Sequence, residues 1–292
     1  MPGLPSLAII IPVYNAAQFI EETLNILAQV LQNNPEIEII LIDDGSSDDT
    51  LKLMQPYADI FHIIALEKNM GKGFAVKSGM LASKAQIRLF TDADLPYGLK
   101  SINRFYYEID FRKYDIAVGT RNQYSCNYEE SLTIIRKLST RIFRFLSTHF
   151  LLTAVDDTQC GIKAFNGEIA DILFDKISVS GFAFDVELLY LSYKLNLDVK
   201  RIPVVFYGNA LTTISILKTT LNMIKDILLL PINYYVTHKY GSTHELEKLS
   251  DNLCRKKRAL ENFAAYEHYP IDKTGIDCHK SRHQETSVQH PA

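Results

Sequence analysis

Continuously apolar segments alternate with amphipathic segments between residues 6 and 94. Four short segments rich in Ile, Leu and Val have the composition of buried strands. These are "SLAIIIPVY" (6–14), "IEIILIDD" (37–44), "DIFHIIAL" (59–66) and "QIRLFTDAD" (86–94). Residues 17–32 and 71–85 carry apolar side chains at helical spacing instead. This order predicts an α/β fold, with a mostly parallel sheet flanked by helices.

Polar side chains follow three of the predicted strands. They are Tyr14 and Asn15, Asp43 and Asp44, and Asp92 and Asp94. Because parallel strands end at the same edge of a sheet, these residues are expected to gather at one site. Asp92 and Asp94 are close enough to repel, and their oxygens suit a hard cation such as Mg²⁺ or Mn²⁺. The alternative for an isolated D-x-D is a turn or helix cap.

Composition excludes several classes of protein. The formal net charge is −3 over 292 residues, so no basic field indicates a nucleic-acid partner. No run of about 18 apolar residues predicts a transmembrane span, and "LAIIIPV" is too short for a signal peptide. Four cysteines without paired spacing fit a reducing compartment. We therefore expect a cytoplasmic protein, either soluble or peripheral on a membrane face.

A series of motifs resembles family 2 glycosyltransferases of the GT-A fold. In order they are "IIIPVYNAA", "IEIILIDDGSSDDT", "NMGKGFAVKSGM", "LFTDAD", "VGTR", "DTQCGIKAF" and "FAFDVELL". Within that family they are most similar to the polyprenyl-phosphate group of dolichyl-phosphate β-glucosyltransferases and mannose synthases. The likeness covers about residues 5–230. The first strand lacks the Gly-rich phosphate loop of a Rossmann dehydrogenase, and the chain has no Trp for a Q-x-x-R-W signature.

The resemblance implies a donor site at this edge of the sheet. It assigns Asp94 to direct coordination of Mg²⁺ or Mn²⁺, and Asp92 to the sugar and ribose side of the site. Both carboxylates are expected to act in catalysis, with Asp92 as a second ligand of the metal ion. The residues that it assigns to the nucleotide-sugar donor are Pro12, Tyr14, Asn15, Asp44, Lys72 and Asp92. The alternatives are a core aromatic for Tyr14, a turn cap for Asp44 and a solvated lysine for Lys72. Pro96 occupies a position where many mannose synthases carry Gln, so a third ligand from this loop is in doubt.

The acceptor site is expected from a second set of residues. Arg121, Arg136 and Arg141 have guanidinium groups suited to phosphate, and the resemblance places such arginines on the lipid phosphate. The alternative is a basic, solvated helix face. Asp157 in "DTQCG" is the first candidate for positioning the acceptor or acting as base. Asp185 and Glu187 in "FDVELL" come second, and all three carboxylates have structural alternatives as caps or buried pair partners.

The C-terminal part of the chain divides into an apolar stripe and a polar tail. The stripe consists of Ile214, Leu217, Leu221, Ile224 and Leu228, with Lys218, Lys225 and Lys239 nearby. It is consistent with packing on the domain or with an interfacial helix over residues 212–235. We predict a catalytic domain over residues 1–230 and a polar tail over 241–292, containing one charged helix.

The sequence thus predicts an inverting, metal-dependent glycosyltransferase that moves glucose from UDP-glucose to a polyprenyl phosphate at a membrane surface. Three alternatives remain. The enzyme could use another donor, such as GDP-mannose, or a soluble or protein acceptor. The chain could also bind nucleotide sugars without catalysing transfer.

Overall fold

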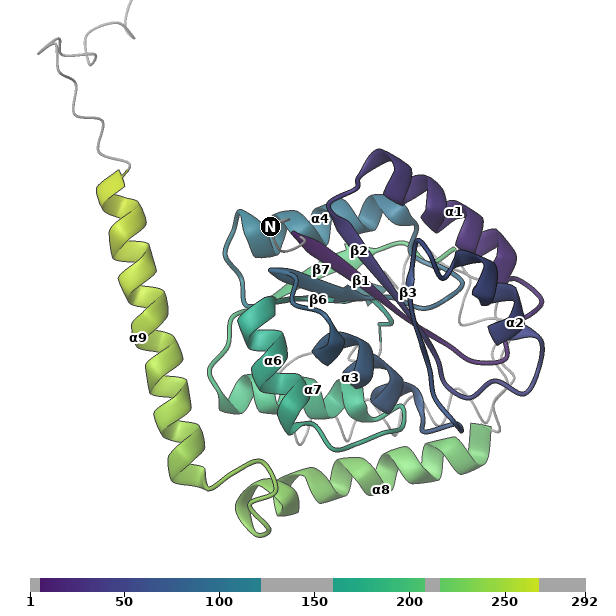
Figure 1. The fold of residues 1–292 in the computed structure, drawn as a ribbon. Helices are drawn as coiled ribbons and strands as arrows, with labels where there is room; N and C mark the ends of the chain where they lie inside the picture. The colour runs from purple at the N-terminus through teal and green to yellow at the C-terminus, as the bar shows by residue number, and fades with distance from the viewer. Residues whose placement is uncertain (1–5, 122–159, 208–215, 268–292) are drawn as a thin grey trace, which may run out of the picture. The chain divides into compact units, whose positions relative to one another are not determined.

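Seven strands form one sheet in the computed structural model, which describes residues 6–121, 160–207 and 216–267. The strands are β1 (Leu7–Val13), β2 (Ile37–Asp43), β3 (His62–Ala65), β4 (Ile87–Phe90), β5 (Ile116–Arg121), β6 (Lys163–Asn166) and β7 (Val199–Val204). Their order across the sheet is β3-β2-β1-β4-β6-β5-β7 (Figure 1). β6 is antiparallel to β4 and β5, and the other neighbouring pairs are parallel. The predicted α/β fold with a mostly parallel sheet is confirmed.

Helices cover both faces of the sheet. They are α1 (Ile20–Asn33), α2 (Thr50–Met54), the 3₁₀ helix η1 (Gln55–Tyr57), α3 (Lys72–Ala82), α4 (Leu99–Asp110), α6 (Gly167–Lys176) and α7 (Phe184–Lys194). In Figure 1, α1 and α4 lie on one face, and α3, α6 and α7 lie on the other. The predicted helices at residues 17–32 and 71–85 correspond to α1 and α3.

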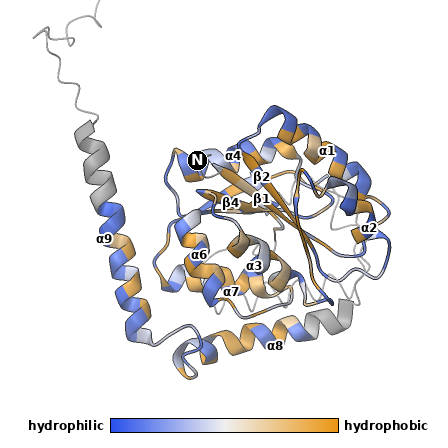
Figure 2. Cartoon of the chain, viewed as in Figure 1, coloured by the Kyte–Doolittle hydropathy of each residue, from blue (hydrophilic) through white to orange (hydrophobic). Residues whose placement is uncertain are grey.

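The alternation of side chains along β1 divides the core between these two layers. Ile9 and Ile11 join the cluster that contains Leu24 of α1, whereas Ile10 faces α3. A methyl group at Gly79 of α3 would lie 2.6 Å from Ile10 Cγ2, so only glycine lets the helix pack this closely on the sheet. Figure 2 shows the resulting concentration of apolar residues in β1, β2 and β4.

The direction of each strand decides which loops meet. β1, β2 and β4 end at the same edge, which brings together the loops that follow Val13, Asp43 and Phe90. Because β6 runs the other way, its start lies at this edge, and Cys160 and Gly161 join the same group of loops. The edge therefore carries both the predicted donor residues and part of "DTQCG".

Two further helices, α8 (Ile216–Tyr235) and α9 (Thr243–Glu267), follow the sheet. α9 confirms the charged helix predicted in the tail. Residues 1–250 form one compact unit, and residues 251–292 form a second. Among the helices that the structure describes, none combines the length and the apolar character needed to cross a bilayer.

Candidate active site

Asp92 and Lys72 form an ion pair at the carboxyl edge of the sheet. Asp92 lies in the loop after β4, and Lys72 is the first residue of α3; its ammonium nitrogen contacts Asp92 Oδ1. Burial opposes the charge on Lys72, but Asp92, Asp185 and Asp94 together raise its pKa above the usual 10.5. The solvated alternative for Lys72 is therefore wrong, because the side chain is largely buried and charged beside carboxylates.

Asp94 is the second carboxylate of this loop and forms no ion pair among the described residues. Partial desolvation and the charge of Asp92 raise the pKa of Asp94 above its usual 3.8, although Lys72 opposes this shift. A cation next to Asp94 would favour its ionised form, because it offsets both the cost of desolvating the carboxylate and the repulsion from Asp92.

The described residues contain no set of three His, Cys, Asp or Glu side chains arranged for a metal. A magnesium-type ion needs only one or two protein carboxylates when diphosphate oxygens and water complete its shell. Asp94 and Asp92 therefore fit such an ion, with Asp94 as the carboxylate that Lys72 leaves available.

Asp44 supports the loop that presents Lys72. It is buried, and its two carboxylate oxygens accept hydrogen bonds from the backbone N–H groups of Met70 (2.7 Å) and Gly71 (3.0 Å). Burial raises the pKa of Asp44, against the effect of these two donors. Gly71 has a φ of +98° and leads directly into α3, where a side chain would also collide with the Ser180 carbonyl oxygen. A contact between Asp44 and the donor base stays a prediction.

The loop after β1 is held against the loop after β2. Asn15, in the left-handed region with a φ of 49°, donates its backbone N–H to Ser46 Oγ and accepts from the backbone N–H of Ser47. Pro12 pairs with Ile42 in the sheet just before this turn. Tyr14 is 47% exposed, so the core alternative for this residue is wrong. An exposed ring here is available to stack on a base.

Gly161 packs directly against Asp92. A methyl group at this position would lie 2.0 Å from Asp92 Oδ2, so the carboxylate rests on the glycine backbone. The backbone N–H of Gly161 donates to Tyr97 Oη at 3.0 Å. Tyr97 is buried, and desolvation raises its pKa, with Cys160 and Asp92 adding to the shift and Arg121 opposing it. The Tyr97 hydroxyl is therefore neutral at physiological pH and can accept this bond.

A second ion pair lies behind Gly161. Lys163 Nζ is 2.6 Å from Asp185 Oδ1 and donates to the Cys160 carbonyl oxygen at 2.9 Å. Glu187 accepts hydrogen bonds from the backbones of Ser178 and Val179 and from two hydroxyl groups. The structural alternatives for Asp185 and Glu187 therefore hold, as a buried pair partner and a loop anchor respectively.

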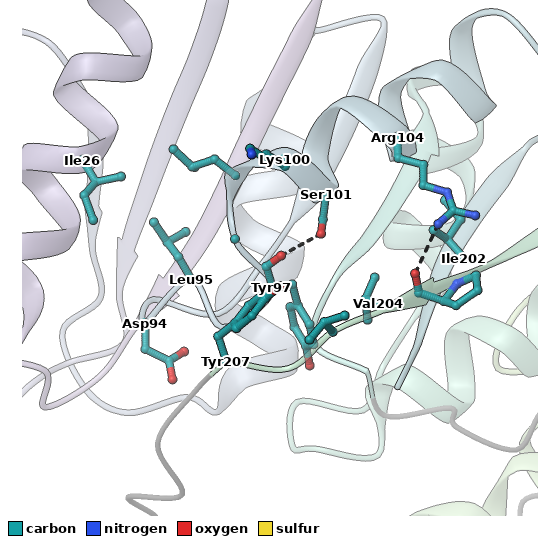
Figure 3. Close-up of a pocket in the computed structure, with 14 residues that line it drawn as sticks. Ile26, Asp94, Leu95, Tyr97, Lys100, Ser101, Arg104, Ile202, Val204 and Tyr207 are labelled. Atoms are coloured by element: carbon teal, nitrogen blue, oxygen red, sulfur yellow. Dashed lines mark hydrogen bonds between the residues drawn. The ribbon is translucent and has the colours of Figure 1, made fainter. Parts of the chain in front are cut away.

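Asp94 forms one end of a pocket of about 580 Å³ between the loop after β4, the start of α4 and the end of β7. Most of the lining is apolar and includes Ile26, Leu95, Leu99, Ile202, Val204 and Tyr207. Figure 3 shows Asp94 and Arg104 at opposite ends of this group, with Tyr97 between them. The pocket can hold an apolar ligand close to the proposed metal ligand.

Of the three arginines predicted to hold the acceptor phosphate, the structure describes Arg121 alone. It ends β5 in register with Val204, close enough for its charge to act on Tyr97. Arg136, Arg141 and Asp157 lie outside the described residues.

Sequence reasoning missed Gly161, Tyr97 and Lys163. A signal for Lys163 was present in "GIKAF", where a lysine stands within an apolar, strand-like segment. Its partner Asp185 is 22 residues away, a pairing that no periodicity reports.

Residues 8–173 match the family described as Glycosyl transferase family 2. A dolichyl-phosphate beta-glucosyltransferase of Dictyostelium discoideum is 30% identical over 244 residues, which cover 78% of this chain and 74% of the relative. The human dolichyl-phosphate beta-glucosyltransferase is 29% identical, covering 78% and 75%.

A similar solved structure is glucosyl-3-phosphoglycerate synthase from Mycobacterium tuberculosis, in complex with Mn²⁺, UDP and glucosyl-3-phosphoglycerate. Its TM-score is 0.58 at 16% identity, with 77% of this chain and 79% of that chain covered. This likeness confirms the GT-A fold. Given the match over more than half of its length, the chain belongs to glycosyl transferase family 2.

Proposed function

We propose that the chain transfers glucose from UDP-glucose to a polyprenyl phosphate, with inversion at the anomeric carbon. The observation that carries this proposal is the position of Asp94, a carboxylate suited to a cation, at one end of a largely apolar pocket. The two curated relatives described above bear the name of this activity. The proposal is more specific than family membership, because it commits to donor and acceptor.

The donor would lie across the loops after β1, β2 and β4. Tyr14 offers an exposed ring for the uracil base, and Lys72 supplies a positive charge beside the donor phosphates. Asp94, with Asp92, would hold Mg²⁺ or Mn²⁺. When bound, such an ion neutralises the negative charge that develops on the departing diphosphate.

The acceptor would approach from the side of the pocket. A phosphate monoester is already an anion at neutral pH, so its oxygen can attack without a strong general base. Arg121 would hold this phosphate through charge-assisted hydrogen bonds. The first isoprene units would occupy the apolar pocket lined by Leu99, Val204 and Tyr207, whose volume is in the range of small-molecule sites.

Helix α8 supports work at a membrane face. The face of α8 that packs on its own unit carries Ile227, Leu230 and Tyr234, all buried. Leu228 from the predicted stripe is 45% exposed, and Ile232 one turn later is 44% exposed. Ile214 and the side chains of Leu217 and Leu221 lie outside the described residues. An apolar strip that faces solvent beside lysines suits a lipid interface.

A donor and acceptor screen tests the proposal. Purified protein is incubated with UDP- and GDP-sugars, with or without a short-chain polyprenyl phosphate, and release of nucleoside diphosphate is measured. We expect release from UDP-glucose that depends on the lipid phosphate and on Mn²⁺ or Mg²⁺. EDTA should abolish turnover, and Asp94→Asn should lower it at least tenfold, because the charge on the leaving group is no longer balanced.

Three results would contradict the proposal. Full activity in EDTA would remove the role of Asp94, and activity only with a soluble acceptor would exclude the lipid phosphate. Binding of UDP-glucose without any transfer would favour a non-catalytic nucleotide-sugar-binding protein.

A further inference from the structure

The ion pair between Lys163 of β6 and Asp185 of α7 is buried. The Lys163 side chain is 1% exposed and that of Asp185 is 6% exposed. The ammonium group also lies 5.4 Å from the centre of the Phe90 ring. Burying two charges carries a large desolvation cost, and well-packed apolar residues often stabilise a fold equally well. Stability is therefore a weak explanation for this pair, and its contacts suggest another.

The first connection runs from Lys163 to the backbone that supports Asp92. The Lys163 ammonium group donates to the carbonyl oxygen of Cys160, the residue before Gly161. Gly161 is held on its other side by Tyr97 Oη and rests against the Asp92 carboxylate. Lys163 and Tyr97 thus hold the two sides of the Cys160–Gly161 peptide group, which leads into the glycine that limits where Asp92 can lie.

The second connection runs through Asp185 to Lys72. The start of α3 packs on the start of α7: a methyl group at Gly73, the residue after Lys72, would lie 2.7 Å from Phe184 Cβ, the residue before Asp185. Across this contact the charges of Lys72 and Asp185 act on each other. Lys163, Asp185, Lys72 and Asp92 therefore form a row of alternating charges that ends at the site. With Asp94 added, three carboxylates and two ammonium groups leave one net negative charge, next to the proposed cation.

We propose that Lys163 and Asp185 are positioning residues of the transfer reaction. Their ion pair holds the Cys160–Gly161 backbone against Asp92 and keeps Lys72 aligned with the same carboxylate. Neither residue needs to touch the donor, since each acts through a neighbour. The inference rests on the proposed function for the identity of the donor.

A double substitution tests this role without leaving an unpaired charge in the core. Lys163→Met with Asp185→Leu removes both charges and keeps the approximate shapes of the side chains. The matched control is Arg88→Met with Asp171→Leu, which removes another ion pair between the same sheet and the α3/α6 layer. Arg88 is buried in β4, and its guanidinium group donates to the Met80 carbonyl oxygen and to Asp171, which lie outside the proposed site.

The measurements are the UDP dissociation constant by calorimetry with Mn²⁺, kcat/KM for UDP-glucose, and the urea midpoint. We expect the Lys163 and Asp185 double variant to weaken UDP binding and lower kcat/KM by tenfold or more while remaining folded. A misplacement of about 1 Å at a reacting centre can cost 100-fold in rate. A tenfold loss therefore corresponds to a shift of Asp92 by less than about 1 Å. The control variant should keep both values within twofold of the wild type, whatever its urea midpoint.

Tyr97→Phe provides a second test, which removes the hydroxyl oxygen on the other side of the Cys160–Gly161 peptide group. It should also weaken UDP binding, because Gly161 loses its hydrogen bond while the ion pair stays intact. A UDP dissociation constant and kcat/KM equal to those of the wild type in the double variant would overturn this inference and leave the proposed function standing. If the double variant does not fold, the same result in Tyr97→Phe would do so. Failure of the wild-type protein to bind UDP would instead overturn the proposed function, and this inference with it.

Discussion

Replacing Gly161 by alanine tests whether the position of Asp92 controls transfer. The added methyl carbon would lie 2.0 Å from Asp92 Oδ2 and 2.7 Å from Cγ. A carbon and an oxygen in close contact are about 3.3 Å apart, so the carboxylate must retreat by about 1.3 Å. Movement of the glycine backbone is opposed, because Tyr97 and Lys163 hydrogen-bond to both sides of the Cys160–Gly161 peptide group.

The expected loss follows from this displacement. A misplacement of about 1 Å at a reacting centre can cost 100-fold in rate, which is about 2.7 kcal/mol of transition-state stabilisation. We therefore expect kcat/KM for UDP-glucose to fall about 100-fold in Gly161→Ala. Asp92 is only partly buried and can rotate toward solvent, so the stability loss should be near the lower end of the range of about 1–3 kcal/mol for overpacking.

Steady-state kinetics with the polyprenyl phosphate acceptor, together with thermal unfolding, measure these effects. Gly181→Ala is the matched control, because a methyl group there meets no atom within 4 Å. It should leave kcat/KM and the melting temperature close to those of the wild type. A Gly161→Ala variant with kcat/KM within twofold of the wild type would refute the proposed role of the Asp92 position.

Three further predictions concern the acceptor, the membrane and pH. Arg121→Ala should raise the KM for polyprenyl phosphate, while UDP affinity measured by calorimetry stays within about twofold of the wild type, because the donor contacts lie on other loops. A loss of UDP affinity as large as the loss for the acceptor would place Arg121 in the donor site instead. Leu228→Glu with Ile232→Glu should abolish co-sedimentation with anionic liposomes at low salt. The circular dichroism spectrum should stay unchanged, because both residues are already exposed to solvent. Undiminished co-sedimentation would exclude this strip as the membrane contact. The hydrogen bonds from Arg88 lower the pKa of Asp171 below its usual 3.8, so the stability that this pair contributes is present above pH 3.8 and is lost as the pH falls through the folded-state pKa. Urea unfolding should therefore show that Asp171→Asn is less stable than the wild type at pH 7 and that this difference in stability shrinks at pH 3. A difference that stays constant between the two pH values would contradict this assignment.

The hydrophobic pattern was sufficient to predict the first half of the sheet. Runs such as "LAIIIPV" and "IEIILID" are apolar at every position, because a parallel strand is buried on both faces. The place of Asp92 and Asp94 followed from the same pattern, since β4 ends at Phe90 and parallel strands end at one edge. These features depend on residues that are neighbours in the sequence, so the amino-acid sequence alone is sufficient to predict them.

Contacts between distant segments decided the rest of the site. Nothing in "DTQCGIKAF" indicates that β6 runs against β4, yet this reversal brings Gly161 to Asp92. Similarly, Asp44 and Asp92 both follow strands, but Asp44 accepts two backbone N–H groups while Asp92 pairs with Lys72. The partner of a charge depends on which side chains the packed helices bring within a few ångströms, and that arrangement forms only when the whole core assembles.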